Sequence, residues 1–264
     1  GEKTQTEGYC TDVYFDAALA FIAEAQQAGN PFFVYLPTNA PHGPYHDVPE
    51  KLYEYYKSID LKPAFGGHPQ DADRLARIFA MIENVDENVG KLFAKLSARG
   101  LQEDTIVVYL HDNGPNTRRF VGPFRGMKGE VHEGGIRSPL FVHWPGRLKA
   151  EAGSDRISAH IDLMPTLLDA AGIDVEAEEL ALDGRSLLPL LEGKKAEWPD
   201  RTLTDDPSKT LNQYFQYVEP LSIYPFSIAP EQKISVRDVI AFQRSTFEGT
   251  IYDITAQPQW LVPS

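Results

Sequence analysis

The sequence predicts an α/β fold in which helices cover a largely parallel central sheet. Short apolar runs of strand length alternate with longer segments whose apolar residues recur at spacings of three and four. Loops rich in Gly and polar residues follow the strand-like runs. The order strand, loop, helix, strand is typical of layered α/β domains.

Residues 11–28 are predicted to form the first helix. Thr11 suits its N-cap and Gly29 suits its end, while one face carries the apolar residues Phe15, Ala18, Leu19 and Ile22. Residues 31–37 form a short apolar run between prolines, which is typical of a buried parallel strand. We expect the loop that follows this strand, which holds His42, to emerge at the same sheet edge as the loop at residues 112–114.

The longest predicted helix spans about residues 72–98, and Gly100 ends it. Residues 105–111 and 139–144 are predicted to be the next two strands. The helix has one apolar face, which is typical of a helix packed against a core. Its members are Leu75, Ile78, Phe79, Ile82, Val85, Val89, Leu92, Phe93 and Leu96.

A further helix is predicted after Asp162, which we expect to cap it. Pro165 is tolerated in a first turn, and Gly172 suits the end of the helix. Beyond residue 201 the pattern weakens, and only residues 234–238 and 251–254 resemble strands.

The net charge, the apolar runs and the cysteine count of the chain exclude some classes of binding partner and of fold. The chain has 264 residues and a formal charge of −13, which argues against nucleic acid and against an anionic membrane surface. No apolar run approaches the ~20 residues that a membrane-spanning helix needs. The single cysteine, Cys10, excludes an internal disulfide.

Residues 111–139 carry most of the candidate chemistry. Asp112 and Asn113 follow a predicted strand, and their side chains offer the hard oxygens that Ca²⁺ or Mg²⁺ prefers. An Asx-turn is the structural alternative for the same residues. A cationic stretch beside a cation site indicates an anionic substrate; its residues are Arg118, Arg119, Arg125, Lys128 and Arg137.

Together these motifs resemble a known family. The motifs are DNG at 112–114, RG-x-KG at 125–129 and EGG-x-R-x-P at 133–139. They resemble the metal- and anion-binding segment of the type I sulfatases, in the alkaline phosphatase-like superfamily. The segments at 39–45, 49–53, 80–90, 160–168 and 182–191 resemble further sulfatase motifs, so the resemblance spans about residues 8–203.

The resemblance implies a sulfatase-type α/β fold with an incomplete, largely parallel sheet. Residues 1–200 would be the carboxyl part of the catalytic domain, and residues 201–264 a divergent or partial α+β subdomain. The implied activity is hydrolysis of sulfate esters on a sulfated small molecule or glycan.

The resemblance also implies roles for individual residues. Asp112 and Asn113 would bind Ca²⁺, with Mg²⁺ as the alternative ion. Lys128 would contact the sulfate group, and His42 would donate a hydrogen bond or proton at the ester oxygen. Arg125 and His132 would contact the substrate.

Several sulfatase elements are absent from the sequence. The nucleophile, a formylglycine made within Cys/Ser-x-Pro/Ala-x-Arg, has no matching motif, because Cys10 lacks both the Pro/Ala and the Arg. The early Asp-Asp pair is missing, and Asp205-Asp206 is better interpreted as a turn. No signal peptide opens the chain. We therefore expect the chain to be a carboxyl portion that is inactive alone.

Two other functions remain open from the residues alone. A phosphate or phosphonate ester hydrolase of the same superfamily would share the fold and metal site. A non-catalytic protein that binds anions or a partner chain would explain the missing nucleophile. The sequence assigns no specific substrate, oligomeric state or compartment.

Overall fold

The computed structural model describes residues 5–65, 71–117, 119, 121–150, 152–173, 182–194, 198, 217–218 and 221–223. The described residues belong to two compact units, one within Gly1–Leu101 and the other within Gln102–Ser227. The predicted domain boundary near residue 200 lies outside the described residues and stays a prediction, as do the strands proposed at 234–238 and 251–254.

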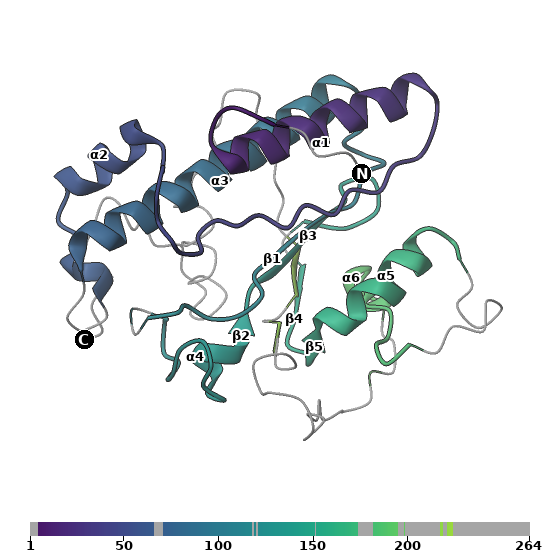
Figure 1. The fold of residues 1–264 in the computed structure, drawn as a ribbon. Helices are drawn as coiled ribbons and strands as arrows, with labels where there is room; N and C mark the ends of the chain where they lie inside the picture. The colour runs from purple at the N-terminus through teal and green to yellow at the C-terminus, as the bar shows by residue number, and fades with distance from the viewer. Residues whose placement is uncertain are drawn as a thin grey trace. The chain divides into compact units, whose positions relative to one another are not determined.

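The first unit is helical. In Figure 1, α1 lies along the long helix α3, and α2 lies near the start of α3. The predicted long helix is confirmed: Asp71 caps it by accepting a hydrogen bond from the backbone N–H of Arg74, and Gly100 follows its end with a positive φ of 68°. The elements are α1 (Cys10–Gln27), α2 (Glu50–Ser58), the 3₁₀ helix η1 (Lys62–Phe65) and α3 (Ala72–Ala98).

The start of α1 corrects the prediction for Thr11. Tyr9, not Thr11, occupies the N-cap position, and its carbonyl accepts the first helical hydrogen bond from Val13 at 3.1 Å. Thr11 lies inside the first turn and is fully buried. The helix begins earlier because Gly8, with a φ of 105°, lets the chain turn into it before Thr11. The predicted end holds, since Gly29 has a φ of 69°.

Hydrogen bonds among Asp12, Asn84 and Asn88, which we name the clasp, join α1 to α3. The Asp12 carboxylate accepts hydrogen bonds from the side-chain amides of Asn84 (2.9 Å) and Asn88 (2.6 Å). Both asparagines are buried, and Lys91 approaches the same carboxylate at 4.0 Å. The buried amides are therefore satisfied by a charged acceptor, the stronger class of hydrogen bond.

The strand predicted at residues 31–37 is not formed. The segment is extended, but none of its residues belongs to a strand, and Phe33 and Tyr35 are 72% and 78% exposed. An apolar run becomes a strand only where a neighbouring strand supplies its hydrogen bonds. Within the described part of the chain, no strand pairs with residues 31–37.

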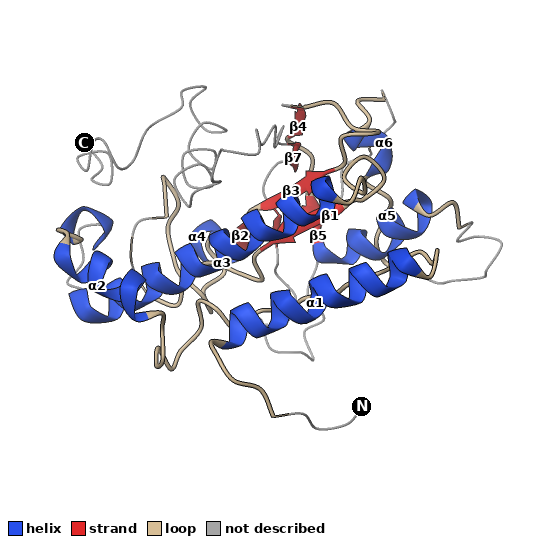
Figure 2. Cartoon of the chain, turned by 90° about the horizontal axis from the view of Figure 1, so that it is seen from above, coloured by secondary structure: helices blue, strands red, loops and turns tan. Residues whose placement is uncertain are grey.

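The second unit contains two small sheets. One has the order β1-β3-β7-β4 and the other the order β2-β6-β5. The strands predicted at residues 105–111 and 139–144 are confirmed as β1 and β3, which lie side by side in Figures 1 and 2. The strands are β1 (Val107–Leu110), β2 (Arg137–Ser138), β3 (Leu140–His143), β4 (Ala152–Ser154), β5 (Ser158–Ala159), β6 (Tyr217–Val218) and β7 (Leu221–Ile223).

Pairing within these sheets is mixed, whereas the sequence predicted a largely parallel sheet. β1 and β3 run antiparallel, with Val107 opposite His143 and Leu110 opposite Leu140. β3–β7 and β2–β6 are parallel, while β4–β7 and β5–β6 are antiparallel. Between β1 and β3 the described residues form loops, one short helix, α4 (Glu133–Ile136), and β2, and they include no long crossover helix that would return the chain for parallel pairing.

The helix predicted after Asp162 is present as α5 (Leu163–Ala170), and Asp162 occupies its N-cap position, but the Asp162 side chain makes no capping hydrogen bond to the helix. A 3₁₀ turn, η2 (His160–Asp162), precedes the helix, and the buried carboxylate instead accepts the backbone N–H groups of Ala159 (2.8 Å) and Arg185 (3.0 Å). The side chain thus ties the start of α5 to the loop that leads to α6 (Leu188–Leu191).

Apolar side chains from β3 and α6 pack together in the core of this unit. That core comprises Leu140, Val142, Leu148, Leu187, Leu188 and Leu191. Among the described helices, none has the length and apolar character needed to cross a bilayer.

Candidate functional site

Asp112 and Asn113 begin the loop that follows β1. The Asp112 side chain is 72% exposed, and its Oδ2 lies 3.9 Å from the Nζ of Lys128. The structure therefore brings together two of the predicted residues, a metal-ligating carboxylate and a sulfate-contacting lysine. In the described structure this ion pair joins the DNG motif directly to the RG-x-KG motif.

Backbone hydrogen bonds hold these motifs in one folded cluster. The N–H of Gly114 donates to the carbonyl of Gly135 at 2.9 Å, and the N–H of Gly134 donates to Arg125 at 2.8 Å. Lys128 is fixed through its own N–H, which donates to the carbonyl of Pro115 at 2.9 Å. We name residues 112–116, 125–129 and 133–135 the glycine cradle.

The glycines of the cradle leave no room for a side chain. A Cβ on Gly114 would lie 1.9 Å from the carbonyl oxygen of Gly134, and one on Gly135 would lie 2.3 Å from that of Met127. A Cβ on Gly134 would lie 2.6 Å from the carbonyl oxygen of Gly126. Gly126 itself has a φ of 102°, a conformation that L side chains rarely adopt. These motif glycines are therefore required by close backbone approach.

The remaining predicted residues of this unit lie on the surface around the cradle. Arg125 is exposed, and His132 is partly buried at the N-cap position of α4. Glu133 pairs with Arg137 at 3.4 Å, and the Arg137 guanidinium stacks over Phe124, so Arg137 makes structural contacts beside the cradle. Arg118 lies outside the described residues.

His111, directly before Asp112, is held by its neighbours. The Tyr109 hydroxyl lies 2.9 Å from its Nε2, and the two rings meet edge to face. Burial lowers the pKa of the His111 imidazole below its ordinary value of 6.5, the Asp112 charge opposes the shift, and Arg119 adds to it. The imidazole is therefore neutral at neutral pH, and Lys128 is the cation paired with Asp112.

The side-chain oxygens after β1 are of the chemical type that binds Ca²⁺ or Mg²⁺. Asp112 and Asn113 offer a carboxylate and an amide oxygen, which hard cations prefer. Ca²⁺ takes about 6–8 oxygens, however, and the described residues include no cluster of three or more His, Cys, Asp or Glu side chains that would hold a metal. Asp112 and Asn113 would therefore be part of a larger ligand set.

His42 belongs to the other compact unit. Its side chain is exposed, and Nδ1 lies 2.6 Å from the carbonyl oxygen of Gly43. A carbonyl oxygen only accepts hydrogen bonds, so Nδ1 carries a proton and Nε2 is the free end of the ring. His46 is also exposed.

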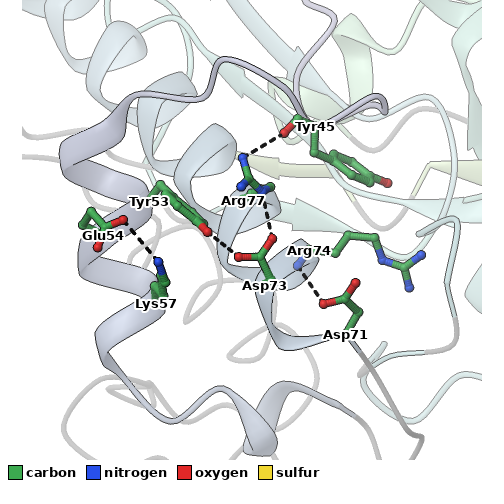
Figure 3. Close-up of polar contacts among 8 residues, drawn as sticks. All are labelled: Tyr45, Tyr53, Glu54, Lys57, Asp71, Asp73, Arg74 and Arg77. Atoms are coloured by element: carbon green, nitrogen blue, oxygen red, sulfur yellow. Dashed lines mark hydrogen bonds and ion pairs between the residues drawn. The ribbon is translucent and has the colours of Figure 1, made fainter.

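Side chains from α2 and α3 anchor the loop that carries His42. The Arg77 guanidinium donates to the carbonyl oxygen of Tyr45 at 3.5 Å and to Asp73 at 3.0 Å (Figure 3). Arg77 also stacks on the ring of Tyr53, 4.3 Å from its centroid, and the Tyr53 hydroxyl donates to Asp73. We name Tyr45, Tyr53, Asp73 and Arg77 the anchor network.

Sequence reasoning missed the anchor network. The spacing of Asp73 and Arg77, four residues apart on a helix, signals an ion pair. It does not reveal that Arg77 reaches the carbonyl of Tyr45, because that contact joins segments far apart in the chain. The shared sheet edge predicted for His42 and the DNG loop depended on a strand at residues 31–37, which is not formed.

Two family models match the chain. The sulfatase model matches residues 2–173, and the model of the C-terminal part of N-sulphoglucosamine sulphohydrolase matches residues 127–261. Both matches include residues 127–135, where Lys128 and the later glycines of the cradle lie.

Individual proteins agree with these models. The chain is 32% identical to the uncharacterized sulfatase YdeN of Escherichia coli over 206 residues, covering 77% of this chain and 34% of that protein. It is 32% identical to the N-acetylgalactosamine-6-sulfatase of Canis lupus familiaris over 193 residues, covering 71% and 33%. The chain thus spans about a third of the length of these curated relatives.

A solved structure gives the same result for the fold. The crystal structure of Ps i-CgsB in complex with k-i-k-neocarrahexaose matches with a TM-score of 0.57 and 29% identity, over 72% of this chain and 40% of that one. This match supports the predicted α/β fold of the sulfatase and alkaline phosphatase-like type. The motifs, the family models and the relatives together establish that this chain belongs to the sulfatase family.

Proposed function

We propose that this chain supplies the sulfate-binding and proton-donating part of a sulfuric ester hydrolase. The observation that carries the proposal is the pairing of Lys128 with Asp112 inside the glycine cradle. The cradle holds a cation and an anion side by side on a rigid backbone. Such preorganised charge is what stabilises the charge that develops in a transition state.

In this proposal Lys128 binds a non-bridging oxygen of the sulfate group. Its side chain is 35% exposed, while its backbone N–H is fixed by the carbonyl of Pro115. In its doubly protonated form His42 would donate the Nε2 proton to the oxygen of the leaving alcohol, while its Nδ1–H stays hydrogen-bonded to the carbonyl of Gly43 and the ring is left neutral. Arg125 and His132 would contact substituents of the substrate at the surface of the cradle.

A divalent cation, Ca²⁺ or Mg²⁺, would complete the site. Asp112 and Asn113 would supply two of its oxygen ligands, and the cation would add positive charge beside the sulfate oxygens. With the cation bound, Asp112 would be shared between the metal and Lys128. The nucleophile, a formylglycine by resemblance, would come from sequence outside this chain.

The proposed substrate is a sulfated glycan or a sulfated small molecule. Support comes from relatives whose names specify such compounds, including the N-acetylgalactosamine-6-sulfatase, and from the neocarrahexaose complex of a structural neighbour. The exposed Arg125 suits a substrate that carries anionic groups beyond the scissile ester.

A chimera tests the proposed function. The matched region of the Canis lupus familiaris N-acetylgalactosamine-6-sulfatase would be replaced by this chain, and hydrolysis of N-acetylgalactosamine 6-sulfate measured with and without Ca²⁺. We expect activity that chelation removes. Replacing Lys128 by Ala should lower kcat by about 100-fold, the usual effect of losing one preorganised charge donor.

Lys149 provides the matched control because it is an exposed lysine of the same unit. Lys149→Ala makes the same change of charge and should leave kcat unchanged. Equal loss of activity in both variants, or an active Lys128→Ala chimera, would overturn the assignment of Lys128.

A further inference from the structure

Asn113 and Gly114 form an Asn-Gly step inside the glycine cradle, and no other asparagine of the chain precedes a glycine. Such a step is chemically reactive, because glycine has no side chain that would shield its backbone nitrogen. The nitrogen attacks the carboxamide carbon of the asparagine, and the succinimide that results is hydrolysed to aspartate or isoaspartate. Asn113 is therefore a candidate site of spontaneous modification as well as a candidate metal ligand.

Deamidation of Asn113 makes a definite demand on the nitrogen of Gly114. In the first step a bond forms between this nitrogen and Cγ of Asn113, and the bond between Cγ and the side-chain nitrogen breaks. The amide proton of Gly114 leaves with that side-chain nitrogen as ammonia. In the second step one water molecule cleaves either C–N bond of the ring. The Gly114 nitrogen must therefore be free to lose its proton and to move toward Cγ.

The folded cradle denies the Gly114 nitrogen both freedoms. Its N–H donates to the carbonyl of Gly135 at 2.9 Å, so the proton is held by an acceptor. The backbone on the other side is fixed as well, because the carbonyl of Pro115 accepts the N–H of Lys128 at 2.9 Å. Movement of the peptide is blocked by the carbonyl oxygen of Gly134, which lies 1.9 Å from the Cβ position of Gly114.

We propose that the glycine cradle protects Asn113 from deamidation, which proceeds only in molecules where the cradle has opened locally. Segments of a folded protein open with their own free energies, which are smaller than the free energy of global unfolding. The rate in the folded chain is then the rate in the open segment multiplied by the fraction of molecules that are open. The proposal concerns the stability of the chain's chemistry and does not depend on the proposed catalytic function.

Isoaspartate would also prevent the cradle from closing again. It adds one methylene to the backbone between residues 113 and 114, where the Cβ position of Gly114 already overlaps the carbonyl oxygen of Gly134. The protecting hydrogen bond from Gly114 to Gly135 is then lost together with the side-chain amide of Asn113. Deamidation at this step is therefore a permanent record that the cradle has opened.

Peptide mass spectrometry of the whole chain tests the proposal. The chain would be incubated at neutral pH with and without denaturing urea, and the fraction deamidated at Asn113 measured over time. We expect the folded chain to react at least about tenfold more slowly than the unfolded chain. Hydrogen exchange at the amide of Gly114 should give a similar protection factor, because both reactions require the same opening.

A cradle variant and a matched control separate local opening from global unfolding. Gly134→Ala places a Cβ 2.6 Å from the carbonyl oxygen of Gly126 and leaves the Asn-Gly step unchanged, so deamidation should be about tenfold faster. Asp12→Ala destabilises the clasp in the other compact unit and should leave the rate at Asn113 unchanged. Both variants would be measured at a temperature where circular dichroism shows them folded.

Two results would overturn the proposal. In the first, Asn113 deamidates as fast in the folded chain as in urea, which needs no variant and holds even if Gly134→Ala does not fold. In the second, Asp12→Ala accelerates the reaction as much as Gly134→Ala does, which would mean that global unfolding, and not the cradle, controls the modification.

Discussion

The glycine cradle and the anchor network hold their candidate catalytic residues by different means. Around Lys128, backbone hydrogen bonds between glycine-rich loops fix the geometry, and no space remains for a Cβ at Gly114, Gly134 or Gly135. Around His42, the loop is held by a side chain, Arg77, which reaches the carbonyl of Tyr45 from α3.

The difference predicts how each loop responds to change. A backbone-held loop has a strict steric requirement and little dependence on pH, because amides do not titrate. A loop held by exposed charged side chains tolerates substitution, and its stability follows the ionisation of those side chains. Three experiments separate these behaviours and a fourth tests the hydrogen bonds between α1 and α3, beginning with the largest expected effect.

Gly114→Ala should be the most damaging of the four changes. Its Cβ would lie 1.9 Å from the carbonyl oxygen of Gly134, so the cradle must move apart, with an expected loss of about 3 kcal/mol in the free energy of unfolding. Gly90→Ala in α3 is the control, since nothing lies within 4 Å of its Cβ position. It should stabilise the chain by about 0.5–1 kcal/mol, because Ala favours helices. Urea denaturation would measure the free energy of unfolding of both variants. Equal changes in Gly114→Ala and Gly90→Ala would refute the steric explanation.

Asp12→Ala tests the buried clasp between α1 and α3. It removes the acceptor of two buried amides, Asn84 and Asn88, and should cost about 2 kcal/mol. Asp16→Ala, an exposed position of the same helix, should change stability by less than about 0.5 kcal/mol. A clasp variant as stable as its control would mean that Asp12 contributes only surface charge.

Arg77→Ala should have a moderate effect. It removes an exposed ion pair, a stacking contact with Tyr53 and the hydrogen bond to Tyr45, together worth about 1 kcal/mol. Lys57→Ala removes an exposed pair with Glu54 and should have almost no effect. Hydrogen exchange should rise in the His42 loop for Arg77→Ala only. Unchanged exchange there would show that Arg77 does not anchor the loop.

Acid pH should weaken the anchor network slightly. The Tyr53 hydroxyl and the Arg77 guanidinium hold the pKa of Asp73 below its ordinary value of 3.8. This contribution to stability is fully present above that value and is lost as the pH falls through the lower pKa of the folded state. Asp73→Asn should therefore reduce the stability difference between about pH 5 and about pH 3. If the unchanged protein and the Asp73→Asn variant lost the same stability between these two pH values, Asp73 would not contribute to the pH dependence.

The sequence predicted the elements whose signals are local. The α3 helix, the β1 and β3 strands, and the proximity of Asp112 to Lys128 follow from periodicity and from a dense motif. Residue type predicts Thr11 and Asp162 as caps, but Tyr9 occupies the N-cap position of α1, and the Asp162 side chain, at the N-cap position of α5, accepts from Ala159 and Arg185 instead of capping the helix.

Features that depend on distant partners could not be predicted. The apolar composition of residues 31–37 predicts a strand. A strand also needs a neighbouring strand to bond with its backbone, and composition cannot show whether one is present. The antiparallel pairing of β1 with β3 likewise depends on the path of the loop between them. The role of Arg77 could not be predicted because it depends on a hydrogen bond to the carbonyl of Tyr45, which lies 32 positions away in the chain.

The tight packing of the glycine cradle has a consequence for how such a chain can diversify. Gly114, Gly134 and Gly135 are closed to a larger residue, so single substitutions at these three positions damage the fold before they can alter selectivity. Exposed positions such as Arg125 and Val131, which face solvent, are open to variation. A mutant library aimed at new substrates should therefore randomise those positions and leave the glycines untouched.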